Sequence, residues 1–281
     1  MVLAVVLGLS ACGGTDDDEA APGVDSGVAE AAELEDGASP ADAAAPDAAD
    51  AADAAPDEVI PPKPDGGAPP CASLQPAPAF CDDFDDGDLK DDWQVLNVSV
   101  GSSAALDTSA HASAPASFAA RTKAIVAQEA AFAHLRTTLT GAPARVRMSF
   151  TAFFPVTTLS KGSLAIATID VSQNHFFTLF LRDTDPDAPG PTLEESVPGT
   201  TTRHVLGSPP PANTWTRIVV DVDLATGKAS VSWDATKALD GATIATTPVA
   251  QDPTIRVGAL YVYGPQDPFE ARFDDVLVEY P

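Results

Sequence analysis

Carboxylates dominate the side chains of this sequence that could carry out chemistry, with 41 Asp and Glu among 281 residues. A retaining glycosidase needs two of them on one face, about 5–5.5 Å apart. Glu194 and Glu195 are adjacent, so they point to opposite faces of any strand. Asp221 and Asp223 share a face, but they lie close to the turn of a predicted hairpin and are expected to face solvent. The carboxylates therefore predict no catalytic pair.

Other reactive side chains give no catalytic motif either. The four histidines, His111, His134, His175 and His204, lack the spacing of metal ligands. Neither a nucleophile elbow nor a phosphate-binding loop occurs. The sequence thus names no catalytic residue, and a non-catalytic role is favoured over an enzyme.

The N-terminal residues predict an export signal. Residues 1–12 read MVLAVVLGLSAC, an apolar stretch that is too short to span a bilayer and is typical of a secretory signal. Its end, Leu9-Ser10-Ala11-Cys12, resembles the bacterial lipobox. This resemblance implies that Cys12 is lipidated and anchors an exported protein in the outer membrane or at the cell surface. The alternative is an apolar start with a free cysteine.

Residues 13–70 predict a disordered tether. This segment holds 17 Ala, 9 Pro and 16 acidic residues, and it has no aromatic residue. It cannot bury enough apolar surface to offset the entropy lost on ordering. An Ala-rich helix is the alternative, but Pro46 and Pro56 bracket its only candidate window.

Residues 71–281 predict one globular domain, because all Trp, Tyr and Phe residues lie beyond residue 79. Cys71 and Cys81 are expected to form a disulfide in an exported protein, with two free thiols as the alternative. The chain carries a net charge of −26, and the domain −11. By bulk charge, this acid excess excludes a binder of polyanions such as nucleic acid, since binding phosphates needs clustered Lys and Arg, and it argues equally against adsorption to an anionic lipid surface.

Short alternating segments separated by turn residues predict an all-β antiparallel sandwich. Residues 124–135 are ambiguous between helix and strand, and strand is favoured. The predicted strands are 116–122, 145–154, 163–171, 176–182, 214–224, 229–234, 255–263 and 271–280.

Three segments together resemble the concanavalin A-like lectin/glucanase superfamily, in its laminin G-like branch. They are the opening FCDDFDDG at 80–87 with Trp93, the hairpin at 215–234, and the pair IRVG at 255–258 and RFDDVLV at 272–278. The resemblance implies a two-sheet jelly roll whose first and last strands are adjacent.

The catalytic motifs of the enzymes in this superfamily can be sought in the sequence. The E-x-D-x-x-E motif of the laminarinase-type members is absent. Alginate-lyase-type members use a His and a Tyr with basic and amide residues around a uronate, and no matching motif surrounds Tyr261 and Tyr263, which share a strand face. We therefore predict a domain that binds a glycan or another surface ligand without catalysis. The alternatives are a glycoside hydrolase or lyase with an unrecognised site, and a structural or adhesive envelope protein.

A structural calcium ion is one possible cofactor. Asp274 shares its strand face with Val276 and Val278, which look core-directed, and a buried carboxylate needs a partner. Many jelly-roll modules hold calcium between their first and last strands, where Asp83 and Asp85 could supply further oxygens. The alternative is that Asp274 accepts backbone N–H groups or pairs with an arginine. An EF-hand is excluded, because its ligand positions would fall on Phe84 and Trp93.

Overall fold

The computed structural model describes residues 71–126, 129–155, 162–183, 190–246 and 250–281. The predicted signal segment with Cys12 and the predicted tether lie outside the described residues. Within them, the structure contains fifteen strands and one short 3-10 helix, Cys71–Ser73. Within these ranges, no helix has the length and apolar character needed to cross a membrane.

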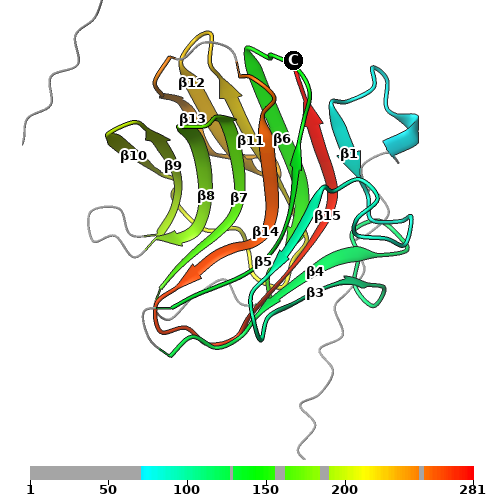
Figure 1. Cartoon of the computed structure of the whole chain (residues 1–281). Helices are drawn as coiled ribbons and strands as arrows, with labels where there is room; N and C mark the ends of the chain where they lie inside the picture. Colours follow the sequence, from blue (N-terminus) through cyan, green and yellow to red (C-terminus); the bar gives the residue numbers. More distant parts are fainter. Residues whose placement is uncertain (1–70, 127–128, 156–161, 184–189, 247–249) are drawn as a thin grey trace, which may run out of the picture. The chain divides into compact units, whose positions relative to one another are not determined.

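The strands form two antiparallel sheets, as the sequence predicts (Figure 1). In the first sheet β1 pairs with β15 beside the path β13-β12-β11-β6-β15-β4-β3. Its strands are β1 (Phe80–Asp82), β3 (Ser103–Asp107), β4 (Ser117–Thr122), β6 (Arg145–Phe153), β11 (Thr216–Asp223), β12 (Lys228–Trp233), β13 (Thr236–Thr243) and β15 (Phe269–Glu279). The second sheet has the order β10-β9-β8-β7-β14-β5-β2. Its strands are β2 (Val95–Val98), β5 (Ala130–Thr138), β7 (Ser163–Ser172), β8 (His175–Asp183), β9 (Gly190–Val197), β10 (Thr200–Val205) and β14 (Thr254–Tyr263).

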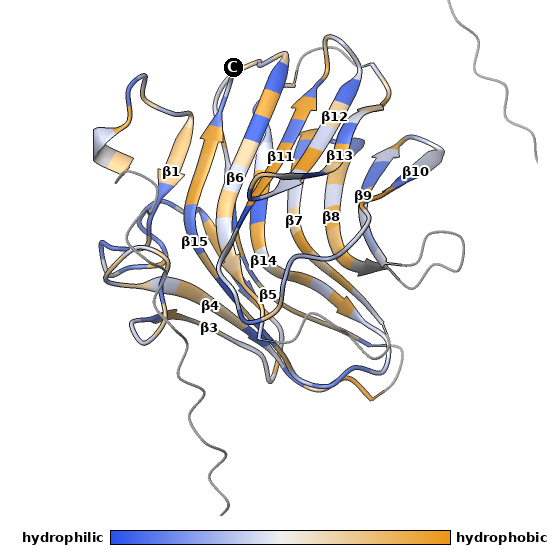
Figure 2. Ribbon diagram, turned by 180° about the vertical axis from the view of Figure 1, so that it is seen from behind, coloured by the Kyte–Doolittle hydropathy of each residue, from blue (hydrophilic) through white to orange (hydrophobic). Residues whose placement is uncertain are grey.

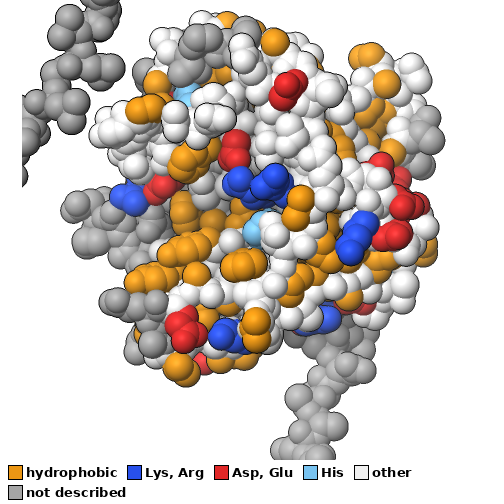
Figure 3. Space-filling view, in the orientation of Figure 1, with side chains coloured by type: hydrophobic (Ala, Val, Ile, Leu, Met, Phe, Trp, Pro, Cys, Tyr) orange, Lys and Arg blue, Asp and Glu red, His pale blue; other side chains and the backbone are white. Residues whose placement is uncertain are grey.

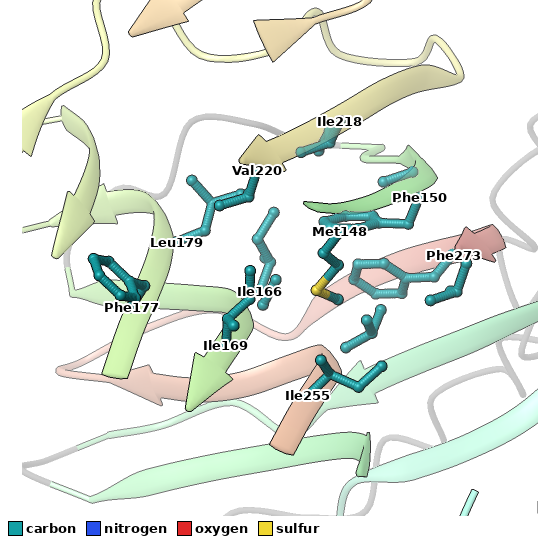
Figure 4. Packing of buried hydrophobic residues seen from close by; sticks show 14 of the residues in the cluster. Met148, Phe150, Ile166, Ile169, Phe177, Leu179, Ile218, Val220, Ile255 and Phe273 are labelled. Carbon is teal, nitrogen blue, oxygen red and sulfur yellow. The ribbon is translucent and has the colours of Figure 1, made fainter. Parts of the chain in front are cut away.

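The core lies between the two sheets and follows the alternation of the strands. Along β11, Ile218, Val220 and Val222 are buried, and they oppose alternate residues of β12 and β6. Figure 2 shows this alternation as hydrophobic and hydrophilic bands along β6, β11 and β15. Side chains from both sheets meet in the middle (Figure 4). The predicted hairpin is therefore confirmed, with Gly227 in the turn at a φ of 62°.

Phe273 lies at the centre of an aromatic cluster in this core. Its ring centroid is 5.9 Å from those of Phe118 and Phe150, and 6.3 Å from that of Phe154. All four rings are fully buried. They come from three strands of the first sheet and from the end of β6, so this cluster fixes β15 against its neighbours.

The first strand, β1, is held by the last strand of the domain and by a disulfide, as predicted. Phe80 of β1 lies opposite Val278 of β15, so the opening and closing strands of the domain are adjacent. The predicted disulfide between Cys71 and Cys81 is present. It joins the segment before β1 to Cys81, which lies within β1. Trp93 packs edge-on against Phe80, at 4.8 Å between centroids.

Reduction of this disulfide should loosen β1 without unfolding the domain. In the chain-entropy model, closing so short a loop contributes about 2–3 kcal/mol, which is part of a typical domain stability. We expect the melting temperature of the full chain to fall by roughly 5–10 °C in reductant. Differential scanning calorimetry with and without reductant tests this, with a Cys71→Ser/Cys81→Ser variant as the control that reductant should not affect. Equal melting temperatures for the oxidised and reduced wild type would remove the stabilising role.

Candidate functional site

The outer face of the seven-stranded sheet carries a row of polar and aromatic side chains. On β5 the alternation buries Ala133 and Leu135 and turns Phe132, His134 and Arg136 outward. Figure 3 shows basic side chains near the middle of this face, beside a histidine and an area of hydrophobic side chains. The core-facing residues thus determine which side chains of β5 form the outer surface.

An open cavity of about 470 Å³ lies on this face. Its lining includes Arg136 from β5, Thr168 and Asp170 from β7, Phe176 and Thr178 from β8, and Arg256 from β14. Arg136 and Arg256 are direct cross-strand partners, and Thr168 lies opposite Arg256 on the other side. Two guanidinium groups are therefore placed side by side in one hollow.

The two arginines differ in their partners. Arg256 forms an ion pair with Asp170, with 2.8 Å between Nη2 and Oδ2, and its Nη1 lies 3.2 Å from Thr168 Oγ1. Burial raises the pKa of Asp170, and the nearby Arg256 partly offsets this. Arg136 forms no ion pair or hydrogen bond with any described residue, and its Nε is buried without a partner. Arg136 is thus a cation in a cavity with unused donors.

His134 lies next to Arg136 on the same face. Its Nε2 is 3.2 Å from the amide nitrogen of Asn97 on β2, while its Nδ1 has no hydrogen-bond partner among the described residues. Burial, with the charges of Arg256 and Arg136, lowers the pKa of His134 to about 4. The imidazole is therefore neutral at physiological pH. Its Nε2 accepts a hydrogen bond from the Asn97 amide, so the ring proton lies on Nδ1 as an unused donor.

A bulge in β14 places two tyrosines on the same face as the arginines. Ala259 pairs with Ala133 and Val262 with Ala131, so Leu260 and Tyr261 together oppose a single residue of β5. The extra residue reverses the alternation: Val257 and Val262 are both buried, while Tyr261 and Tyr263 turn outward with Arg256. Their rings are parallel within 7°, with 5.7 Å between centroids.

Gly258 interrupts the row of side chains on β14 between Arg256 and Tyr261. It has a φ of 133°, and a Cβ there would lie 2.5 Å from the carbonyl oxygen of Ala133 and 2.8 Å from Cα of His134. No other residue fits this position without moving β5. The glycine therefore allows the backbones of β14 and β5 to approach closely beside His134.

The carboxylates considered from the sequence have structural partners. Glu195 is buried and accepts hydrogen bonds from the backbone of Ala245 and from His175, whose Nε2 is 2.9 Å away. Glu194 points to the opposite face and pairs with Arg203. Asp221 pairs with Arg145 on the outer face of the first sheet. None of these groups lines the cavity.

The calcium candidates are only partly brought together. Asp83 and Asp85 lie in the segment after β1, where Asp85 accepts the N–H of Ala116 and is close enough to Asp275 for the two charges to repel. Asp274 is buried, and its carboxylate accepts the backbone N–H groups of Ala112 and Ser113 at 2.7 and 3.0 Å. No group of three or more His, Cys, Asp or Glu among the described residues could hold a metal ion. The calcium site stays a prediction, whose test is melting with chelator and with added calcium.

One detail of the prediction for Asp274 is wrong. A register shift between Asp274 and Leu277, with Asp275 at a φ of 51°, makes Phe273 and Val276 both point into the core. Asp274 therefore does not share the face of Val276. It lies on the outer face of the first sheet, opposite Thr151, where the segment at 112–113 covers it.

Asp274 and Asp275 should make stability depend on pH. Burial and the charge of Asp275 raise the pKa of Asp274 to about 8, well above its unfolded value of about 4. The folded state thus binds the proton more tightly, and the contribution of this group to stability falls as pH rises from about 4 to about 8. Asp275→Asn removes the repelling charge, and asparagine tolerates a positive φ. We expect the variant to melt a few degrees above wild type at pH 8 and close to it at pH 4. The same pH slope in both proteins would contradict this coupling.

Comparisons with known proteins agree on the fold. No family model matches the chain, and no curated protein matches it in sequence. An endo-β-1,4-glucuronan lyase from the fungus Trichoderma reesei aligns with a TM-score of 0.56 and 14% identity, over 73% of this chain and 96% of that one. A cellulose-induced protein, Cip1, aligns with a TM-score of 0.54 and 12% identity, over 72% and 97%. The likeness shows the fold.

Sequence reasoning missed the residues of this site. His134 lacks the spacing of a metal ligand, and no sequence pattern marks Asn97 or Arg136 as a site residue. Each comes from a different position along β2 or β5, and no local motif joins them. The one available signal was the outward register of β5, which places His134 and Arg136 on one face.

Proposed function

We propose that the outer face of the seven-stranded sheet binds an acidic glycan, with Arg136 as the ligand of a sugar carboxylate. The observation that carries this proposal is the state of Arg136, a cation with a buried Nε and no hydrogen-bond or ion-pair partner among the described residues, in a cavity that it shares with Arg256. These two arginines are a local exception to the acid excess of the domain, whose net charge is −11. A guanidinium binds a carboxylate through two parallel hydrogen bonds. A bound carboxylate would satisfy the donors that the protein leaves unused.

Two further observations support an acidic sugar polymer as the ligand. The cavity is open rather than enclosed by the described residues, so a chain can enter and leave it along the sheet. One solved structure that aligns over nearly its whole length is named a glucuronan lyase. Glucuronan is an acidic glycan. The exposed tyrosines add apolar surface of the kind found in ligand sites.

A second candidate function is that the protein cleaves the glycan as a lyase. One group of side chains on the outer face of the seven-stranded sheet favours it. The neutral His134, the amide of Asn97, two arginines and the exposed Tyr261 lie on one face. These are the residue types that the resemblance implies for alginate-lyase-type members. An assay for unsaturated uronate products decides between the two. Product formation that His134→Ala abolishes would establish a lyase, and binding without product would leave a binding module.

Calorimetric titration of the full chain with a polyuronate tests the binding proposal. We expect binding that weakens with salt, because charge-assisted contacts are screened. The matched control is the same polymer with its carboxyl groups reduced to alcohols, which should not bind. Equal affinity for both polymers, or no affinity for any acidic glycan, would overturn the proposal.

We further propose that Cys12 anchors the protein in the outer membrane or at the cell surface, so that residues 13–70 hold the binding domain away from the lipid. The support is the lipobox resemblance of residues 9–12 and the composition of the segment that follows. Cys12→Ala should release the protein from membrane fractions and abolish labelling by a fatty-acid probe. Labelling that persists in Cys12→Ala would refute the anchor.

A further inference from the structure

We infer that the ligand is an oligosaccharide longer than a disaccharide, extended along β14, with an acidic sugar at Arg136 and Arg256 and another sugar packed on Tyr261 and Tyr263. This inference rests on the proposed binding of an acidic glycan and adds its minimum length and its direction on the sheet. It follows from three features of β14 and its neighbour β5.

The first feature is the bulge at Leu260 and Tyr261. In a regular strand Arg256 and Tyr261 would face opposite sides of the sheet, because their positions differ by an odd number. The extra residue brings both to the outer face, while Val262 remains in the core. The charged end and the aromatic end therefore form one continuous surface.

The second feature is the distance between these ends. Arg256 and Tyr261 are five residues apart, which corresponds to roughly 15 Å along a bulged strand. A single sugar cannot contact both ends, and a disaccharide is too short to lie fully on both. Between them, Gly258 is buried against the backbone of β5, so β14 projects no side chain from this position.

The third feature is the exposure of the tyrosine pair. Tyr261 is 42% exposed, and it is the only aromatic side chain among the large exposed hydrophobic residues of the described chain. The rings of Tyr261 and Tyr263 are stacked, with 5.7 Å between centroids, so each covers one face of the other. The pair is held rigid in this way, and its free ring surface can pack on the apolar face of a sugar ring while the phenol oxygens bind sugar hydroxyl groups. This end recognises ring shape, whereas the arginine end recognises charge.

A series of purified oligouronates, from disaccharide to hexasaccharide, tests the inference by calorimetry on the full chain. For wild type we expect affinity to rise with length until both ends are filled and then to level off. Tyr261→Ala should weaken binding of the hexasaccharide by roughly tenfold and leave that of the disaccharide unchanged. Tyr261→Phe should keep most of the affinity. Val205→Ala, an exposed apolar residue on the edge strand β10, is the matched control and should change nothing.

The outcomes separate this inference from the proposed function. Wild-type affinity that is the same for every length, or a Tyr261→Ala variant that weakens all lengths by the same factor, would overturn the two-ended site and leave acidic-glycan binding intact. Failure of every acidic oligosaccharide to bind wild type would overturn both. The wild-type length series does not depend on any variant folding.

Discussion

Arg136→Ala should weaken binding of an acidic glycan by roughly a hundredfold, because it removes one partner of a desolvated charge pair. Arg136 forms no hydrogen bond or ion pair with a described carboxylate, whereas Arg256 already pairs with Asp170. Arg136→Lys keeps the charge but loses the planar fork, so its affinity should fall between those of wild type and Arg136→Ala. Calorimetric titration with a polyuronate measures all three.

The matched control for this variant is Arg203→Ala on β10. Arg203 belongs to the same sheet, and it pairs with Glu194 outside the cavity lining. Its replacement should leave glycan affinity unchanged. Arg136→Ala should also change the melting temperature little, since the side chain forms no hydrogen bond or ion pair with a described residue and acts on Asp170 only through its charge. A variant that binds as wild type does would show that Arg136 is not the carboxylate ligand.

Phe273→Ala should destabilise the domain by about 3–5 kcal/mol, the usual cost of a large cavity in a core. Phe273 is fully buried, and its ring lies beside three other buried rings from β4, β6 and the residue after β6. In a domain of this size the melting temperature should fall by roughly 10 °C or more. Thermal unfolding followed by circular dichroism measures the change.

Two further variants check the cause of this loss. Phe273→Leu keeps most of the volume and should cost well under half as much. Val205→Ala removes exposed apolar atoms and should have almost no effect. If Phe273→Ala and Phe273→Leu shift the melting temperature equally, the cavity is not the source of the loss.

The sequence by itself determined the fold class and most of the strands. The alternation in β11, from Ile218 to Val222, is a local property of the chain, so the buried face could be predicted before any partner strand was known. The pairing of Cys71 with Cys81 followed from the cysteine count, and the pairing of β1 with β15 followed from the resemblance to concanavalin A-like domains. The strands β2, β3, β9, β10 and β13 were not predicted. β2 and β3 have only four and five residues, and β9, β10 and β13 have few apolar residues and no strong alternation.

Only the tertiary structure decided which side chains share the binding face. A bulge is a mismatch between two paired strands, so the residues of β14 alone do not reveal that Tyr261 turns to the side of Arg256. The bulge in β15 moved Asp274 off the core face for the same reason. The contact of Asn97 with His134 depends on the register between β2 and β5, which are more than thirty residues apart. Cross-strand register is set by the packing of the whole sandwich, and the site depends on it.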